Sequence, residues 1–207
     1  MISRRGVLGG GALALLAGCA PTAEGPAASV DTGQEGWHGT HLADGGGPLP
    51  DVTLTDQNGQ PYNLATGPTT RAVALFFGYT NCPDVCPGIM ADMATARRRL
   101  PEDLIDDVTL IVVTTDPARD TPEVLKTYLS RVDESFVGLT GPLEDIVPAA
   151  MSLGIDIAEG KQLPSGGYEV DHGTYVLGFG EDRLLRVVWN GLSAGELKDD
   201  FERLIAA

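Results

Sequence analysis

The sequence predicts an α/β fold in which a central mixed β-sheet is flanked by helices. Two short apolar runs, residues 72–77 and 108–113, have the pattern of strands that are buried on both faces of a sheet. Each run is followed by a helical pattern, over residues 87–100 and from Thr121 onward. The order strand, helix, strand, helix indicates a βαβ unit with parallel strands.

The remaining elements are assigned by the same criteria. Residues 52–56 alternate between polar and apolar side chains and precede Asn58 and Gly59, which is typical of a strand entering a hairpin turn. In the second helix, Thr121 is suited to the N-cap and Pro122 to the first helical position. We further expect a short strand at 136–139, a helix at 142–153, a strand pair at 175–179 and 184–188, and a closing helix at 196–205. A βαβ half followed by a β-hairpin and a closing helix is the thioredoxin-like order.

The N-terminus has the pattern of a targeting segment. Arg4 and Arg5 are followed by the apolar run 7–17, which is shorter than the roughly 20 residues that span a bilayer. The motif LAGC at 16–19 resembles a bacterial lipobox, which implies that Cys19 becomes the acylated first residue of the mature chain. The sequence thus predicts an extracytoplasmic protein, lipid-anchored to the outer face of the bacterial cell membrane. The motif SRRGVL at 3–8 also resembles a twin-arginine signal, so the export route stays open.

Composition divides the chain into a signal peptide at 1–18, a tether at 19–47 and one domain at 48–207. The beginning of the tether is rich in Ala, Pro, Gly, Thr and Ser, a composition that buries little apolar surface. The chain has 14 basic and 29 acidic residues and a formal net charge of -15, which argues against nucleic acid as a partner. An acidic surface favours cationic partners and metal ions, although solubility is its commoner purpose.

With Cys19 assigned to the lipid anchor, Cys82 and Cys86 are the remaining cysteines. They lie between a predicted buried strand and a predicted helix, where the helix N-terminus favours the thiolate over the thiol. The C-x-x-x-C spacing would put the second sulfur about one helical turn after a first cysteine in the first turn, so that both sulfurs can face one ion. A stabilising disulfide is the alternative, but so short a loop removes little entropy from the unfolded chain.

Four segments carry a resemblance to a known family. They are FGYTNCPDVCP at 77–87, TTDPARDTP at 114–122, FVGLTG at 136–141 and VDH at 170–172. Over residues 48–205 the chain resembles the Sco (SenC) family of copper proteins, which serve cytochrome c oxidase assembly. The resemblance implies a thioredoxin-like fold and a copper site formed by Cys82, Cys86 and His172.

His172 is also a candidate on other grounds. It is one of three histidines and lies just before the strand predicted from Tyr175, in a loop that faces the cysteines in thioredoxin-like proteins. Gly173 stands near the position where thiol oxidoreductases carry a cis-Pro, which leaves room for a side chain such as that of His172. Two thiolates and an imidazole suit Cu(I). The same donors accept zinc, so the resemblance and the extracytoplasmic setting are what favour copper.

Asp116 follows a buried strand, and the resemblance places it near the metal. It would orient His172 or assist the docking of a partner, and its alternative role is to stabilise the turn that it begins. Arg119 and Asp120 are interpreted as a structural pair and cap.

Four further residues have an open role. His38 and His41 form either an accessory metal site or, as favoured by the loop composition around them, a surface or docking segment. Met90 and Met93 either offer thioethers to Cu(I) or, as helical spacing more often means, fill the core.

The leading functional hypothesis is a metallochaperone rather than an enzyme. It would receive copper from a donor protein and deliver it to the binuclear copper centre of a cytochrome c oxidase subunit. The rival is a thiol-disulfide reductase that keeps the cysteines of that subunit reduced, since the pair Cys82 and Cys86 can be oxidised reversibly. A peroxiredoxin-like peroxidase is disfavoured because residues 80–86 do not reproduce the turn that holds the attacking cysteine in those enzymes.

Overall fold

The computed structural model describes residues 36–162, 168–172 and 174–207. The predicted signal peptide, Cys19 and the first part of the tether lie outside the described residues. Within the described ranges, no helix combines the length and the apolar character that crossing a membrane requires.

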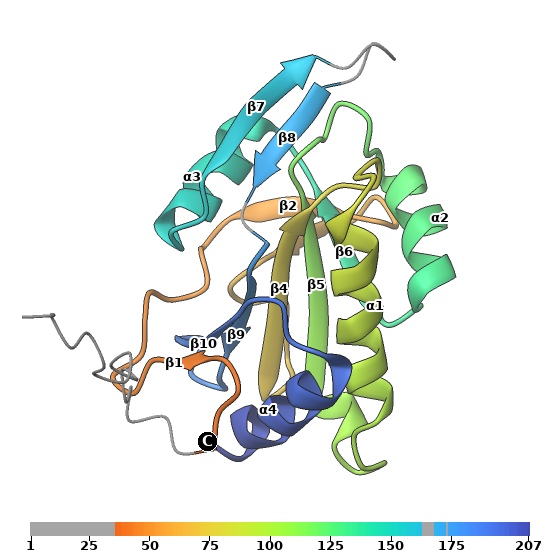
Figure 1. Cartoon of the computed structure of the whole chain (residues 1–207). Helices are drawn as coiled ribbons and strands as arrows, with labels where there is room; N and C mark the ends of the chain where they lie inside the picture. The colour runs from red at the N-terminus through yellow and green to blue at the C-terminus, as the bar shows by residue number, and fades with distance from the viewer. Residues whose placement is uncertain (1–35, 163–167, 173) are drawn as a thin grey trace, which may run out of the picture. The chain divides into compact units, whose positions relative to one another are not determined.

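The main sheet has eight strands in the order β1-β10-β9-β4-β5-β6-β2-β3, and β7 and β8 form a separate hairpin (Figure 1). The strands are β1 (Thr40–His41), β2 (Thr53–Asp56), β3 (Pro61–Asn63), β4 (Ala72–Gly78), β5 (Val108–Thr114), β6 (Phe136–Thr140), β7 (Ile157–Gln162), β8 (Tyr168–His172), β9 (Val176–Phe179) and β10 (Leu185–Trp189). The helices are α1 (Val85–Arg98), α2 (Pro122–Val132), α3 (Leu143–Ser152), α4 (Ala194–Ala206) and the short 3₁₀ helix η1 (Ile105–Asp107).

The pairing confirms the predicted mixed sheet. Strand β5 is parallel to both β4 and β6, as expected of βαβ crossovers through α1 and α2. Strand β9 is antiparallel to β4 and to β10, and β2 is antiparallel to β6. The centre of the sheet therefore consists of β4 and β5, and the C-terminal end of β4 leads directly into the segment that carries the cysteines.

Alternation along β4 divides the core into two layers. Ala72, Ala74 and Phe76 pack with residues of α1 and α4, whereas Val73, Leu75 and Phe77 pack with α3 and with the segment before β4. Met90 and Met93 are buried in the first layer, which agrees with a core-filling role. Because β4 is buried on both faces, its end is a rigid base for the loop that follows.

The hairpin of β7 and β8 is not predicted by the sequence. In this hairpin Ile157 pairs with His172, so the backbone of His172 ends a strand instead of lying in a loop as expected. Ile157 is half-buried and packs against both core layers, which joins this end of the hairpin to the domain.

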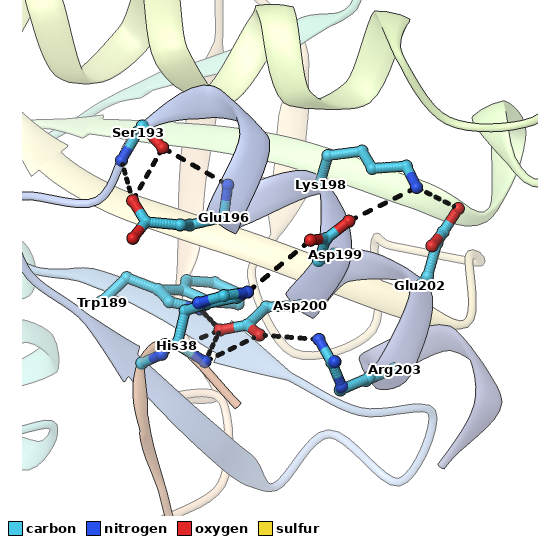
Figure 2. A network of polar contacts seen from close by, with 10 residues as sticks. His38, Trp189, Ser193, Glu196, Lys198, Asp199, Asp200, Glu202 and Arg203 are labelled. Carbon is cyan, nitrogen blue, oxygen red and sulfur yellow. Dashed lines mark hydrogen bonds and ion pairs between the residues drawn. The ribbon is translucent and has the colours of Figure 1, made fainter. Parts of the chain in front are cut away.

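The described part of the predicted tether is held against the domain. The backbone N–H groups of His38 and Gly39 donate to the buried carboxylate of Asp200 in α4, at 3.0 and 2.9 Å (Figure 2). The indole Nε1 of Trp189 donates to the same carboxylate at 2.8 Å. In addition, β1 pairs with the edge of β10. Residues 38–41 of the predicted tether therefore contact α4 and β10 of the domain.

Candidate metal centre

The two cysteines lie where β4 gives way to α1. Helix α1 begins at Val85, so Cys86 lies in its first turn, whereas Cys82 lies in the preceding loop. Cys82 therefore lies in the turn between strand and helix, as predicted, whereas Cys86 is already helical because α1 begins two residues before the predicted start at residue 87. Cys86 is fully buried, Cys82 is half-buried, and neither forms a disulfide.

The surroundings of the two sulfur atoms shift their pKa values in opposite directions. Burial raises the pKa of the Cys82 thiol, but hydrogen bonds from the Cys86 thiol and from the backbone N–H groups of residues 84–86 outweigh burial, and the pKa is lowered. Burial and the hydrogen bond to Cys82 raise the pKa of Cys86 well above its ordinary value. Asp84 is the N-cap residue of α1, but its side chain accepts no hydrogen bond from the first turn. The Cys82 sulfur accepts backbone N–H groups there instead.

A buried carboxylate fixes the loop that carries Cys82. Asp120 is completely buried and accepts hydrogen bonds from the backbone N–H of Thr80 at 2.9 Å and from its hydroxyl at 2.5 Å. It also accepts the hydroxyl of Thr114, at the end of β5, at 2.7 Å. Asp120 thus joins the cysteine loop to β5, a role that the sequence does not reveal.

The positions of Asp116 and Arg119 differ from the sequence interpretation. Arg119 forms an ion pair with Asp116 rather than with Asp120, and Asp116 is fully buried. Thr121 is the N-cap of α2, as predicted, since its side chain accepts the N–H of Val124. The pairing of Asp120 with Arg119 is therefore wrong, and the role of Asp116 in the metal site stays a prediction.

Replacing Asp120 with asparagine is expected to loosen the cysteine loop. Three groups donate hydrogen bonds to Asp120, and an amide has one acceptor oxygen where a carboxylate has two. At least one donor would lose its partner, so the free energy of unfolding should fall by about 1–3 kcal/mol. Thermal unfolding of the metal-free protein should show a melting temperature lower by about 2–4 °C for each kcal/mol lost. Copper affinity should fall as well, since the loop that holds Cys82 is less ordered.

Asp200→Asn is the matched control, because Asp200 is an equally buried carboxylate in α4 that binds the N-terminal segment instead of the cysteine loop. It should lower the melting temperature with unchanged copper affinity. An Asp120→Asn protein with the parent's copper affinity would show that Asp120 does not position the site.

The side chain of His172 lies outside the described part of the structure. The position of its backbone relative to the cysteines follows from the residues around it. Ile157, its backbone partner, packs against the core layer that contains Cys86. Thr174 lines the same surface groove as Asp84 and Val85, which lie between the two cysteines in sequence. Tyr128 of α2 is half-buried against the core layer that contains Cys86, and this burial is the main cause that raises the pKa of its hydroxyl.

The histidines near the N-terminus are arranged differently from a metal site. The ring of His41 stacks on Trp37, with ring centroids 4.6 Å apart, and Nε2 of His38 lies 3.6 Å from Asp199 (Figure 2). Residues 37–39 form a loop, which agrees with the expectation from their composition. Among the side chains that the structure describes, which do not include that of His172, no three or more of His, Cys, Asp or Glu are grouped as a metal site requires.

Comparison with known proteins identifies the family. Residues 49–206 match the profile of the SCO1/SenC family. The chain belongs to the SCO1/SenC family. The profile covers the cysteine loop, Asp116, Asp120 and His172 within a single domain, in agreement with the resemblance that the sequence motifs carry.

Solved structures of Sco proteins share the fold of this SCO1/SenC chain and confirm that it is thioredoxin-like. The copper-bound ScoI of Bradyrhizobium japonicum is 31% identical, with a TM-score of 0.67 over 77% of this chain and 98% of the other. The apo Sco1 of Thermus thermophilus is 32% identical, with a TM-score of 0.71 over 81% of this chain and 96% of the other. In sequence, a protein of Stutzerimonas stutzeri with the provisional name of a copper-binding protein is 38% identical, over 67% of each chain.

Proposed function

We propose that this SCO1/SenC protein is a copper carrier, in which Cys82, Cys86 and His172 hold the metal. The observation that carries the proposal is the contact between the two sulfurs at the head of α1, where one is stabilised as thiolate and the other is buried beside it. Thiolates are soft donors that suit Cu(I), and they also bind zinc. Copper-bound relatives from a bacterium and a plant support copper as the metal.

We infer further that the copper is cargo rather than a resident cofactor. Cys82 is half-exposed, so one donor is open to solvent and to an incoming ligand set, whereas Cys86 is enclosed by the core. Such an arrangement allows an acceptor to replace Cys82 first while Cys86 still holds the ion. The acceptor proposed is the copper-binding subunit of cytochrome c oxidase, at its binuclear centre, with a separate copper donor protein loading the carrier. Asp116 is proposed to orient His172 or to assist docking.

The test is copper binding and transfer by protein that is purified reduced and without oxygen. We expect one copper ion per chain and transfer to the isolated copper-binding domain of the oxidase subunit from the same organism, followed by the appearance of the spectrum of the binuclear centre. A protein that holds zinc and takes up no copper under these conditions would contradict the proposal.

A second candidate function, thiol-disulfide reduction of the same subunit, has its own support. A thiolate with a lowered pKa beside a second thiol is the arrangement that attacks a disulfide and then resolves the mixed intermediate. In that case electrons pass from Cys82 and Cys86 to the cysteines of the subunit, and this protein ends with a disulfide.

We also propose that Cys19 anchors the protein to the outer face of the cell membrane. The lipobox-like motif at 16–19 supports acylation of this thiol after removal of the signal peptide. Mass spectrometry of the mature protein should show Cys19 as its first residue with several acyl chains, since one chain holds a protein at a membrane only marginally. Cys19→Ser should release the protein from membranes, and an unmodified Cys19 would contradict the proposal.

A further inference from the structure

A surface groove of about 380 Å³ runs beside the cysteine loop. Its lining includes apolar side chains, namely Ile89 of α1, Val176 of β9, Trp189 of β10 and Leu197 of α4. Val176, Trp189 and Leu197 are almost fully buried, so they form the base of the groove. The indole of Trp189 is held in place by its hydrogen bond to Asp200 (Figure 2). The groove thus has a rigid apolar base.

The groove borders the cysteine loop. Asp84 and Val85, which line it, lie between Cys82 and Cys86 in the chain, and Thr174 lines it close behind His172. A segment that lies in the groove therefore contacts the residues that connect the two cysteines in the chain. The groove therefore combines an apolar base with a border formed by the cysteine loop, as a docking surface for a copper acceptor requires.

The groove carries negative charge, which favours a segment of a partner protein that carries positive charge. Asp84 and Asp92 contribute carboxylates, while no Lys, Arg or His is among the described residues that line it. The whole chain has a formal net charge of -15, which strengthens the attraction of a cationic group. An apolar base beside carboxylates fits an apolar side chain that is neighboured by a lysine or an arginine.

The groove is also open for such a segment. A Cβ atom built on Gly88 of α1 or on Gly191 meets no atom within 4 Å, so both glycines leave space at the two sides. Val85 at the entrance has an exposed fraction of 41%, which is high for an apolar side chain on the surface of a domain.

From these observations we propose that the groove docks a loop of the copper-accepting oxidase subunit, with an apolar side chain on Trp189 and Leu197 and a lysine or arginine at Asp84 and Asp92. The inference rests on the proposed function, because it assumes copper transfer to that subunit. Docking there brings the ligands of the acceptor beside Cys82, so that one thiolate is exchanged at a time.

The first experiment fills the groove. Gly88→Leu adds a side chain that points into open space, and leucine favours a helix more than glycine does, so the protein should fold. Ala91→Leu is the matched control, since Ala91 is an exposed residue of α1 outside the groove. The probe is the isolated copper-binding domain of the oxidase subunit. We expect Gly88→Leu to slow copper transfer about tenfold or more at low acceptor concentration, with Ala91→Leu close to the parent.

The second experiment tests the charge. Asp92→Lys should weaken binding of the acceptor domain and flatten its dependence on salt concentration. Glu134→Lys is the control, because it changes the net charge equally at an exposed position after α2. Both groove variants should keep the parent's own copper affinity, measured by competition with a chelator.

The outcomes distinguish a failure of the proposed function from a failure of the proposed docking surface. If the parent protein transfers no copper to the domain, the proposed function fails. If the parent transfers copper and Gly88→Leu does so equally fast, the proposed function stands and the groove is not the docking surface. A groove that is occupied by a second copy of this chain, seen as a dimer that Gly88→Leu dissociates, would also overturn the assignment.

Discussion

Copper binding is expected to disappear when Cys82 and Cys86 are oxidised to a disulfide. The two sulfurs already share a hydrogen bond, so a bond between them needs little movement of the loop. A disulfide has no negative charge and is a poor donor, so the ion would lose both thiolates. Since loss of a partner outside the ligand shell alone costs about 10–100-fold in metal affinity, loss of two ligands should cost more.

The measurement is a Cu(I) titration against a coloured chelator, with the oxidised and the reduced protein side by side. Reduction of the oxidised sample should restore the original affinity, which controls for damage to the fold. If the oxidised protein binds as tightly as the reduced one, other groups carry the metal, and His38 and His41 would be the first to examine.

His172→Ala is expected to separate the carrier from the reductase. Removing one donor from a site of three leaves a two-coordinate ion that competitors can take, so copper affinity should fall strongly, by about 100-fold or more. Thiol exchange depends instead on thiolate fraction and access. The hydrogen bonds at the start of α1 supply these to Cys82. The variant should therefore still form and exchange its disulfide at nearly the parent's rate.

In cells the two functions then give different results. A carrier with His172→Ala should lose cytochrome c oxidase activity and regain part of it when copper is added to the medium. A reductase with the same change should support nearly normal activity, whereas Cys82→Ser should fail in either case. His38→Ala is the matched control, because its imidazole lies beside Asp199 of α4 rather than at the cysteines. Unchanged copper affinity in His172→Ala would remove His172 from the site.

The sequence predicts the central fold well because its strongest patterns are local. Strands β4 and β5 are continuous apolar runs, and α2 has a threonine at its N-cap followed by a proline. Each element is therefore recognisable without its neighbours. The hairpin of β7 and β8 is not predicted, because residues 157–172 are rich in glycine and charged residues and show no clear alternation. Strand β1 has two residues and exists through its pairing with β10.

The same distinction applies to the site. The spacing of Cys82 and Cys86 is a local signal, and the structure brings their sulfurs together. The role of Asp120 is not local, because its partner Thr80 is 40 positions away in the chain. A neighbouring arginine made an ion pair with Asp120 the natural interpretation, but the fold turns Arg119 toward Asp116 instead. The contacts of Asp120 with Thr80 and Thr114 become visible only once β4 and β5 are placed side by side.

The short pairing of β1 with β10 has a practical consequence for handling the protein. A recombinant domain that started at Pro48, where composition places the domain boundary, would lack β1 and expose the backbone of β10 as an open sheet edge. Open edges are templates for pairing with another chain, so such a shortened domain should self-associate and precipitate more readily. It would also deprive the buried carboxylate of Asp200 of the His38 and Gly39 donors. Solution studies of copper binding therefore call for a chain that retains residues 36–47.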